Sequence, residues 1–160
     1  MKNKILTMLL GYPLAGKTTY AEKNLAGKSI IISADMIRQQ MLGLYYYEKA
    51  EQMIWEKRYY MLDYLLRQDV DIAIDETNLL FDRRMETVTL ARGYCYKINY
   101  VHLATPYEIC KQRIQEKIDN AITHAEKFDK IKKKVAMEGM HVRGFEQLKP
   151  FEYDSLIELS

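Results

Sequence analysis

Near its start the chain carries Gly11-Tyr12-Pro13-Leu14-Ala15-Gly16-Lys17-Thr18, which matches the pattern Gly, four residues, Gly-Lys-Ser/Thr without a mismatch. The apolar run Lys4–Leu10 before it predicts a buried strand, and Lys17–Leu25 predicts the helix that follows. Glycines let the backbone of such a loop approach an anion closely, and its N–H groups then point inward at the positive end of the helix. We therefore predict that the loop binds the phosphates of ATP through Gly11, Tyr12, Pro13, Leu14, Ala15, Gly16, Lys17, Thr18 and Thr19.

Two side chains of this loop have expected roles beside the phosphates. Lys17 is expected to bridge the β- and γ-phosphates, and the Thr18 hydroxyl to bind Mg²⁺. A second Mg²⁺ ligand is expected where an apolar strand ends in an acidic residue, and Val70–Ile74 leads directly into Asp75 and Glu76. We predict that Asp75 serves the metal, with Glu76 as the alternative.

The rest of the chain alternates short apolar runs with helical patterns, which predicts an α/β fold with a mostly parallel sheet. Further strands are expected at Ser29–Ser33, Val70–Ile74, Lys97–Leu103 and Leu156–Leu159. Helices are expected at Asp35–Leu42 with Asp35 as its cap, at Glu48–Arg67, at Asp82–Arg92, and from Pro106 to about Gln115. On the longest of these, the apolar face is expected to hold Ala50, Met53, Ile54, Met61, Tyr64 and Leu65.

Composition narrows the class of protein. The 160 residues suit one domain, 1–160, and the net charge of +2 favours no particular partner. Residues 111–143 hold nine Lys/Arg and five Asp/Glu, a local net charge of +4, which suits a phosphate or a polyanion. The two cysteines lack metal-ligand spacing, and the first apolar run is too short for a signal or a membrane span. We therefore expect a cytoplasmic protein with reduced cysteines and no membrane partner.

Three segments together resemble the P-loop kinases related to bacteriophage polynucleotide 5′-kinase, within a wider group that includes zeta-toxin-like and chloramphenicol phosphotransferase-like kinases. They are Gly11–Thr18, then Ser33-Ala34-Asp35-Met36-Ile37-Arg38, and then Asp75-Glu76-Thr77-Asn78. The resemblance continues through Arg83-Arg84, Thr105-Pro106 and the closing segment from Phe145. It implies a three-layer α/β P-loop kinase fold, with about five parallel strands in the order 2-3-1-4-5 and a helical lid at about 116–143.

The resemblance also implies catalytic roles. Asp35 would be the general base for the acceptor hydroxyl, and Arg38, three residues later on the same helix, would bind an acceptor phosphate. The alternatives are a plain helix cap and a surface arginine. Arg113 matches an arginine of the family's lid that neutralises charge during transfer, alongside Lys17. Lys117 stands where the family often has a second arginine, and it keeps the charge without the fork geometry.

Other candidate residues have simpler explanations. Lys132, Lys133 and Lys134 are expected to form a solvated helix face rather than an acceptor channel. Trp55, Tyr59 and Tyr60 are expected to pack in the core or an interface, while Tyr45–Tyr47 are kept as a wall of the acceptor site. No histidine has a metal partner at ligand spacing.

Three functions are consistent with these features. The first is an ATP-dependent kinase that acts on a hydroxyl of a nucleic acid, most directly a 5′-hydroxyl. The second is a kinase of a small acceptor, such as a nucleoside or a nucleotide. The third is a nucleotide-binding module with little catalysis. The Asp35 and Arg38 pair favours an enzyme over a module.

Overall fold

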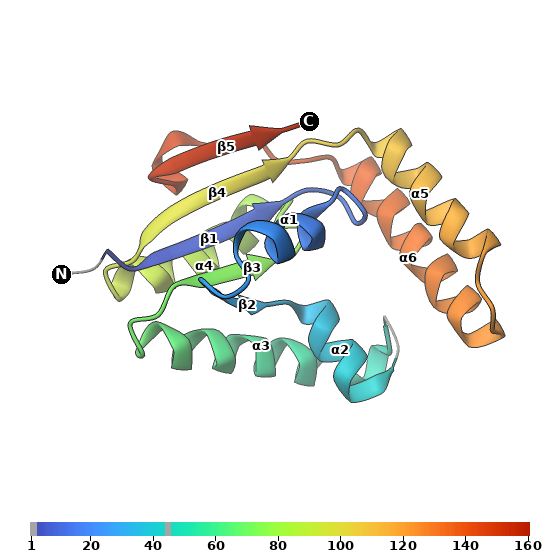
Figure 1. Ribbon diagram of the computed structural model, residues 1–160, viewed down its shortest axis with the longest axis horizontal. Helices are drawn as coiled ribbons and strands as arrows, with labels where there is room; N and C mark the ends of the chain where they lie inside the picture. The colour runs from blue at the N-terminus through green and yellow to red at the C-terminus, as the bar shows by residue number, and fades with distance from the viewer. Residues whose placement is uncertain (1–2, 44–45) are drawn as a thin grey trace.

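Five parallel strands form the sheet of the computed structural model, which describes residues 3–43 and 46–160. The strands are β1 (Ile5–Leu10), β2 (Ile30–Ile32), β3 (Ile72–Asp75), β4 (Lys97–Leu103) and β5 (Ser155–Leu159). Their order is β2-β3-β1-β4-β5, and every neighbouring pair is parallel. The predicted order 2-3-1-4-5 is therefore confirmed, with β1 at the centre of the sheet (Figure 1).

The helices lie between the strands along the chain. They are α1 (Lys17–Asn24), α2 (Ala34–Leu42), α3 (Glu51–Leu66), α4 (Phe81–Gly93), α5 (Tyr107–Asp119) and α6 (His124–Arg143), with 3₁₀ turns η1 (Glu48–Ala50) and η2 (Pro150–Glu152). Over the described ranges, none of them combines the length and the apolar character needed to cross a membrane.

Alternate side chains of β1 point into two cores, which gives the predicted three layers. Leu6, Met8 and Leu10 pack with residues of α3 and α4, among them Leu62, Leu66, Val88 and Ala91. Leu9 packs on the other face with residues of α1, α5 and α6, among them Ala21, Cys110, Ile114 and Met137. Because all strands are parallel, the loops after β1 and β3 and the start of α2 meet at one edge of the sheet, where a ligand site is expected.

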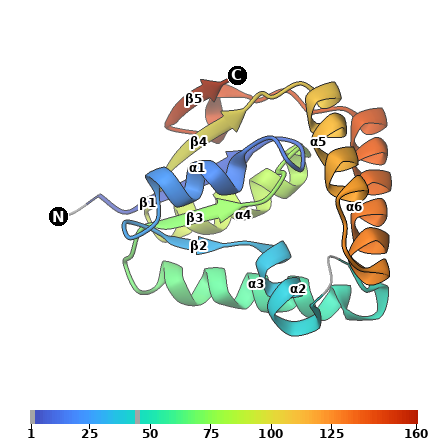
Figure 2. The ribbon, with the colours of Figure 1, turned by 45° about the vertical axis from the view of Figure 1, so that its right-hand side comes forward.

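Residues 116–143 are helical, as predicted, and are divided between the end of α5 and α6. Helix α5 continues past Gln115 to Asp119, and α6 runs for 20 residues from His124. Thr123 caps α6 by accepting a hydrogen bond from the backbone N–H of Glu126 at 3.1 Å. The two helices lie side by side at the end of the sheet where the strands finish (Figures 1 and 2). Ile118 of α5 and Met137 of α6 are buried in this helix pair.

The predicted face of α3 is partly wrong. The buried positions are Ile54, Arg58, Leu62 and Leu66, four residues apart, whereas Met53 and Tyr64 are 43% and 54% exposed. Trp55, Tyr59 and Tyr60 are exposed as well and do not belong to the core. Tyr45, which we expected near the acceptor, lies outside the described residues. A polar residue, Arg58, thus occupies a core position that periodicity assigns to an apolar side chain.

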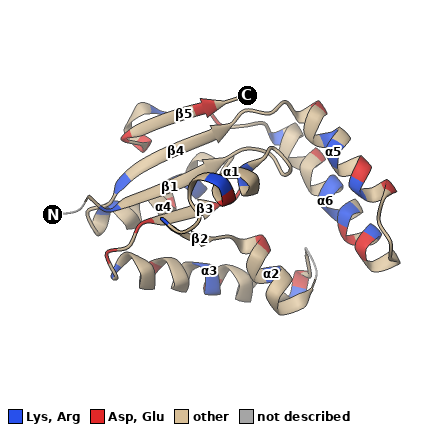
Figure 3. Ribbon diagram, viewed as in Figure 1, with Lys and Arg blue, Asp and Glu red and all other residues tan. Residues whose placement is uncertain are grey.

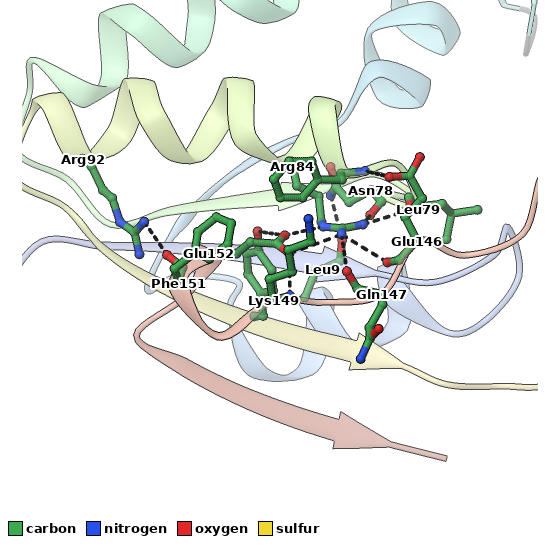
Figure 4. A network of polar contacts seen from close by, with 12 residues as sticks. Leu9, Asn78, Leu79, Arg84, Arg92, Glu146, Gln147, Lys149, Phe151 and Glu152 are labelled. Atoms are coloured by element: carbon green, nitrogen blue, oxygen red, sulfur yellow. Dashed lines mark hydrogen bonds and ion pairs between the residues drawn. The ribbon is translucent and has the colours of Figure 1, made fainter.

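The C-terminal segment is held to the body of the protein by the fully buried Arg84 (Figure 4). Its Nε donates to Glu152 Oε1 at 2.6 Å, and Glu152 is buried too. Its two Nη groups donate to backbone carbonyls of the loop after β3 and of the C-terminal segment, those of Asn78, Leu79, Glu146 and Gln147. Glu152 also accepts from Tyr100, and burial beside this carboxylate raises the pKa of the Tyr100 phenol.

Candidate functional site

The loop between β1 and α1 has the geometry that its glycines predict. Gly11 has a φ of +150°, and a Cβ there would lie 2.7 Å from the Leu103 carbonyl oxygen, so only glycine fits. Gly16 caps α1 with a φ of +104°. Pro13 and Ala15 are buried against the body of the protein, while Thr18 and Thr19 are exposed at the start of the helix. The backbone therefore leaves the positive end of α1 open toward a bound anion.

Lys17 is folded back onto the same loop. Its Nζ donates to the carbonyl oxygens of Gly11 at 3.0 Å and Tyr12 at 2.7 Å. Burial lowers the pKa of Lys17 to about 8, although the nearby carboxylate of Asp75 opposes that shift. The positive charge of Lys133 lowers the pKa of Lys17 further, and the negative charge of Asp35 raises it. Both residues therefore lie close enough to the loop for their charges to act on Lys17.

The lowered pKa of Lys17 predicts that nucleotide binding takes up a proton above pH 8. The free ammonium is mostly charged at pH 7 and mostly neutral at pH 9, whereas bound phosphates favour the charged form. ATP affinity should therefore fall about tenfold between pH 7 and pH 9. Titration calorimetry at pH 9, in two buffers with different ionisation enthalpies, should detect the uptake of about one proton.

A Lys17→Arg variant supplies the control, because a guanidinium stays charged at both pH values. Its ATP affinity, whatever its absolute value, should not change between pH 7 and pH 9. An equal loss of affinity in the wild type and in this variant would show that another group titrates.

The two candidate metal ligands lie together. The Thr18 hydroxyl donates to Asp75 Oδ2 at 2.8 Å, and Asp75 is buried at the end of β3. Glu76, the alternative ligand, points elsewhere and is bound by the buried Arg58, whose Nη2 lies 2.6 Å from Glu76 Oε1. The geometry therefore favours Asp75 as the carboxylate beside Thr18.

This donor set fits Mg²⁺. The cation prefers oxygen ligands, and in nucleotide sites it keeps several waters and uses one or two protein groups together with substrate phosphates. One hydroxyl and one carboxylate at hydrogen-bond distance suit that chemistry. In the ranges 3–43 and 46–160, no group of three or more His, Cys, Asp or Glu residues could enclose a metal by itself.

Asp35 is not the cap of its helix, contrary to our expectation. Ser33 caps α2 by accepting from the backbone N–H of Met36 at 3.3 Å, and the helix begins at Ala34. Asp35 therefore does not cap the helix. Its half-exposed carboxylate faces two cations. Arg38 Nη1 lies 2.7 Å from Oδ1, and Lys133 Nζ lies 3.8 Å from Oδ2.

Arg38 is buried and is held by a residue that the sequence did not indicate. Glu51, at the start of α3, accepts from Arg38 Nε and Nη2, each at 2.7 Å. This bidentate pair fixes the plane of the guanidinium, while Nη1 reaches Asp35. Arg38 thus orients the Asp35 carboxylate, and it is not the surface arginine that we kept as an alternative.

Lys133 corrects our prediction for the lysine run. It is mostly buried and lies beside Asp35, so it is not part of a solvated face. Burial lowers the pKa of Lys133 while Asp35 opposes the shift, and the positive charges of Lys130 and Lys117 lower it further. The neighbouring Lys134 donates to Gln115 of α5 at 2.7 Å. Basic and acidic residues alternate along α5 and α6, so the helix pair is not a uniformly basic surface (Figure 3).

Helices α5 and α6 contact the phosphate-binding loop directly. Arg113 Nη1 donates to the Leu14 carbonyl at 2.8 Å, and Thr105 Oγ1 donates to the Ala15 carbonyl at 2.8 Å. His141 of α6 lies edge-to-face with Tyr12 of the loop, with 6.2 Å between ring centres, and it stacks on Tyr107 of α5 at 3.8 Å. Arg113 therefore stands beside the loop as the resemblance implies, whereas Lys117 is exposed one turn further along α5.

Glu51 and Arg58 were not predicted as site residues, and Lys133 was expected on a solvated helix face. A signal existed for Arg58, because it falls four residues after Ile54 and four before Leu62 on the buried stripe. An arginine at a core position needs a carboxylate partner, and Glu76 was available at a strand end. No comparable signal distinguishes Glu51 or Lys133 from the other charged residues of their helices.

A family model and a curated relative both match most of this chain. A family model described as an AAA domain matches residues 6–137. An L-seryl-tRNA(Sec) kinase of Methanococcus maripaludis is 27% identical over 138 residues, with 78% of this chain and 52% of that protein covered. The chain thus spans about half the length of this curated relative.

Solved structures share the fold at lower identity. A protein of Chloroflexus aurantiacus superposes with a TM-score of 0.73 at 16% identity, with 99% of this chain and 88% of that chain covered. A chain of the Pnkp1/Rnl/Hen1 RNA repair complex gives a TM-score of 0.65 at 17% identity, with 94% of this chain and 51% of that chain covered. The predicted P-loop kinase fold is confirmed, while the kinase activity and the polynucleotide 5′-kinase subgroup stay predictions.

Proposed function

The chain belongs to the AAA domain family of P-loop kinases, and we propose that it transfers the γ-phosphate of ATP to the 5′-hydroxyl of a nucleic acid. One observation carries the proposal. Asp35 is a half-exposed carboxylate, it is held in place by Arg38 and Lys133, and its charge acts on the Lys17 ammonium of the phosphate-binding loop. A general base beside a phosphate-binding lysine is what hydroxyl phosphorylation requires.

Each side chain of the site has its own role in the proposed phosphate transfer. The acceptor oxygen bonds to the γ-phosphorus while the bond from that phosphorus to the β–γ bridging oxygen breaks, and Asp35 takes the hydroxyl proton. Lys17 leaves its two carbonyl partners to contact the β- and γ-phosphates. Thr18 and Asp75 would hold Mg²⁺, which supplies positive charge to the phosphates when it is bound. Arg113 stands beside the loop, where it can neutralise charge that develops during transfer.

The cations around Asp35 support an acceptor that carries a phosphate of its own. A 5′-terminal nucleotide has such a group on its 3′ oxygen, and Arg38 and Lys133 lie on either side of the proposed base. A phosphate could take over one of the guanidinium contacts that Glu51 makes. The names of two relatives mention RNA, a seryl-tRNA in one and an RNA repair complex in the other, which supports an acceptor that contains RNA.

A comparison of two acceptors tests the choice of substrate. Thymidine 3′-phosphate should be phosphorylated on its 5′-hydroxyl with a kcat/KM about 10- to 100-fold above that of thymidine, because charge-assisted hydrogen bonds to Arg38 are gained. An Arg38→Lys variant should lose most of that preference; because Arg38 also orients Asp35, the readout is the ratio of the two kcat/KM values within each variant. Equal efficiency for the two acceptors in the wild type would move the assignment to a small-molecule kinase.

A further inference from the structure

A pocket with a cavity volume of about 850 Å³ is lined in part by Trp55, whose ring lies near Arg38. It is lined by α3, the loop after β3, the first turns of α4 and the end of α6. Trp55 connects the pocket to the acceptor site, because its ring centre lies 5.8 Å from Arg38 Cζ and 5.7 Å from Arg83 Cζ. Residues 11–19 do not line the pocket, so it is separate from the loop that binds the phosphates of ATP.

Aromatic side chains of α3 form part of the pocket wall. Trp55, Tyr59 and Tyr60 all line it, and they are 38%, 57% and 70% exposed. Large aromatic side chains left uncovered on one helix need an explanation, because a monomeric protein normally buries such surface. A flat, uncharged ring that stacks on them would cover that surface.

The charges of the side chains that line the pocket argue against a phosphate group as its ligand. Three arginines line the pocket, but so do four Asp and Glu side chains, which gives a sum of −1. Arg58 is paired with Glu76 at 2.6 Å, and Arg83 lies 3.7 Å from Glu86. The phosphates of an acceptor therefore belong outside the pocket, near Arg38, and a neutral group belongs inside it.

We infer that this pocket receives the base of the 5′-terminal nucleoside of the acceptor, with Trp55 as its stacking partner. The inference rests on the proposed function and adds what the enzyme recognises besides the hydroxyl and the phosphate. With the 5′-hydroxyl at Asp35 and the 3′-phosphate at Arg38, the base of the same nucleoside lies within reach of the Trp55 ring, which adjoins Arg38.

Trp55 is the single tryptophan of the sequence, so its fluorescence reports on the pocket without any turnover. In the absence of ATP, thymidine 3′-phosphate should quench this fluorescence in a saturable way. The abasic compound 1,2-dideoxyribose 3-phosphate keeps the five-membered ring, the 5-hydroxyl and the phosphate but lacks the base, and it should leave the fluorescence nearly unchanged.

Kinetics with the same two compounds provide the second measurement. The wild type should prefer thymidine 3′-phosphate over its abasic analogue by about tenfold in kcat/KM, since stacking on one aromatic side chain contributes roughly that much. A Trp55→Ala variant should lose this preference, so that its kcat/KM values for the two compounds become equal, whatever their absolute size. Tyr64→Ala is the matched control, because Tyr64 is an exposed tyrosine of α3 that does not line the pocket, and its preference should equal that of the wild type.

The outcomes separate this inference from the proposed function. Transfer to both compounds at equal rates, without base-dependent quenching, would overturn the pocket assignment and leave the kinase assignment intact. Base-dependent quenching without transfer to either compound would support the pocket and contradict the proposed acceptor. An equal loss of base preference in Trp55→Ala and Tyr64→Ala would also overturn it, because the effect would then belong to the helix as a whole.

Discussion

An Asp35→Asn variant is expected to bind ATP as tightly as the wild type and to transfer its γ-phosphate about 10³-fold more slowly. General-base catalysis contributes on the order of 10²- to 10⁴-fold, and an amide of the same shape cannot take the hydroxyl proton. The fold should tolerate the change, because Asp35 is half-exposed and Ser33, not Asp35, caps the helix. Single-turnover transfer from saturating ATP to thymidine 3′-phosphate measures the chemical step, and titration calorimetry measures ATP affinity.

Asp82→Asn provides the matched control. Asp82 is the second residue of α4, as Asp35 is the second residue of α2, so both substitutions remove the same charge from the same place near a helix N-terminus. Asp82→Asn should therefore transfer phosphate at the wild-type rate. A wild-type rate in Asp35→Asn, or equal losses in the two variants, would remove Asp35 from the role of base.

An Arg84→Met variant is expected to lose about 3–5 kcal/mol of the free energy of unfolding, a large share of what a domain of this size has. Methionine fills a similar volume, but it leaves the fully buried Glu152 carboxylate without its main cation and releases the backbone carbonyls that Arg84 binds (Figure 4). Urea denaturation followed by circular dichroism gives the free energy of unfolding and its dependence on urea.

Two further variants identify the cause of that loss. Arg83→Met changes the adjacent residue, whose side chain is 63% exposed, and should shift the free energy of unfolding by no more than about 0.5 kcal/mol. The double variant Arg84→Met/Glu152→Gln should be no less stable than Arg84→Met, because the unpaired buried charge is gone. If the losses of Arg84→Met and Glu152→Gln simply added, the two side chains would not be stabilising each other.

Local patterns were sufficient to predict the α/β class and the shape of the phosphate-binding loop, whereas the strand order came from the family resemblance. The glycine and lysine spacing of Gly11–Thr18 has a direct structural cause, and the structure places an open helix end and Lys17 where that motif requires them. Asp75 could also be predicted, because a strand end beside the central strand brings its side chain to the loop after β1. In each case the relevant residues are close in sequence or are related by the parallel register of the sheet.

The proposed acceptor half of the site depends on ion pairs that no local pattern reveals. Glu51 reaches Arg38 across 13 residues. Lys133 reaches Asp35 from α6, so its burial depends on how the α5–α6 pair docks on the sheet. In the sequence, a charged helix residue that contacts water looks the same as one that pairs with a carboxylate of another element. Only the tertiary packing distinguishes the two.

We propose that the chain phosphorylates a 5′-hydroxyl. Transfer of labelled γ-phosphate from ATP to a short single-stranded oligonucleotide tests this directly. One sample carries a free 5′-hydroxyl, and the other has the same sequence with a 5′-phosphate already in place. We predict Mg²⁺-dependent label at the 5′ end of the first oligonucleotide and none on the second. Absence of label from the 5′-hydroxyl oligonucleotide, or equal labelling of both, would contradict the account.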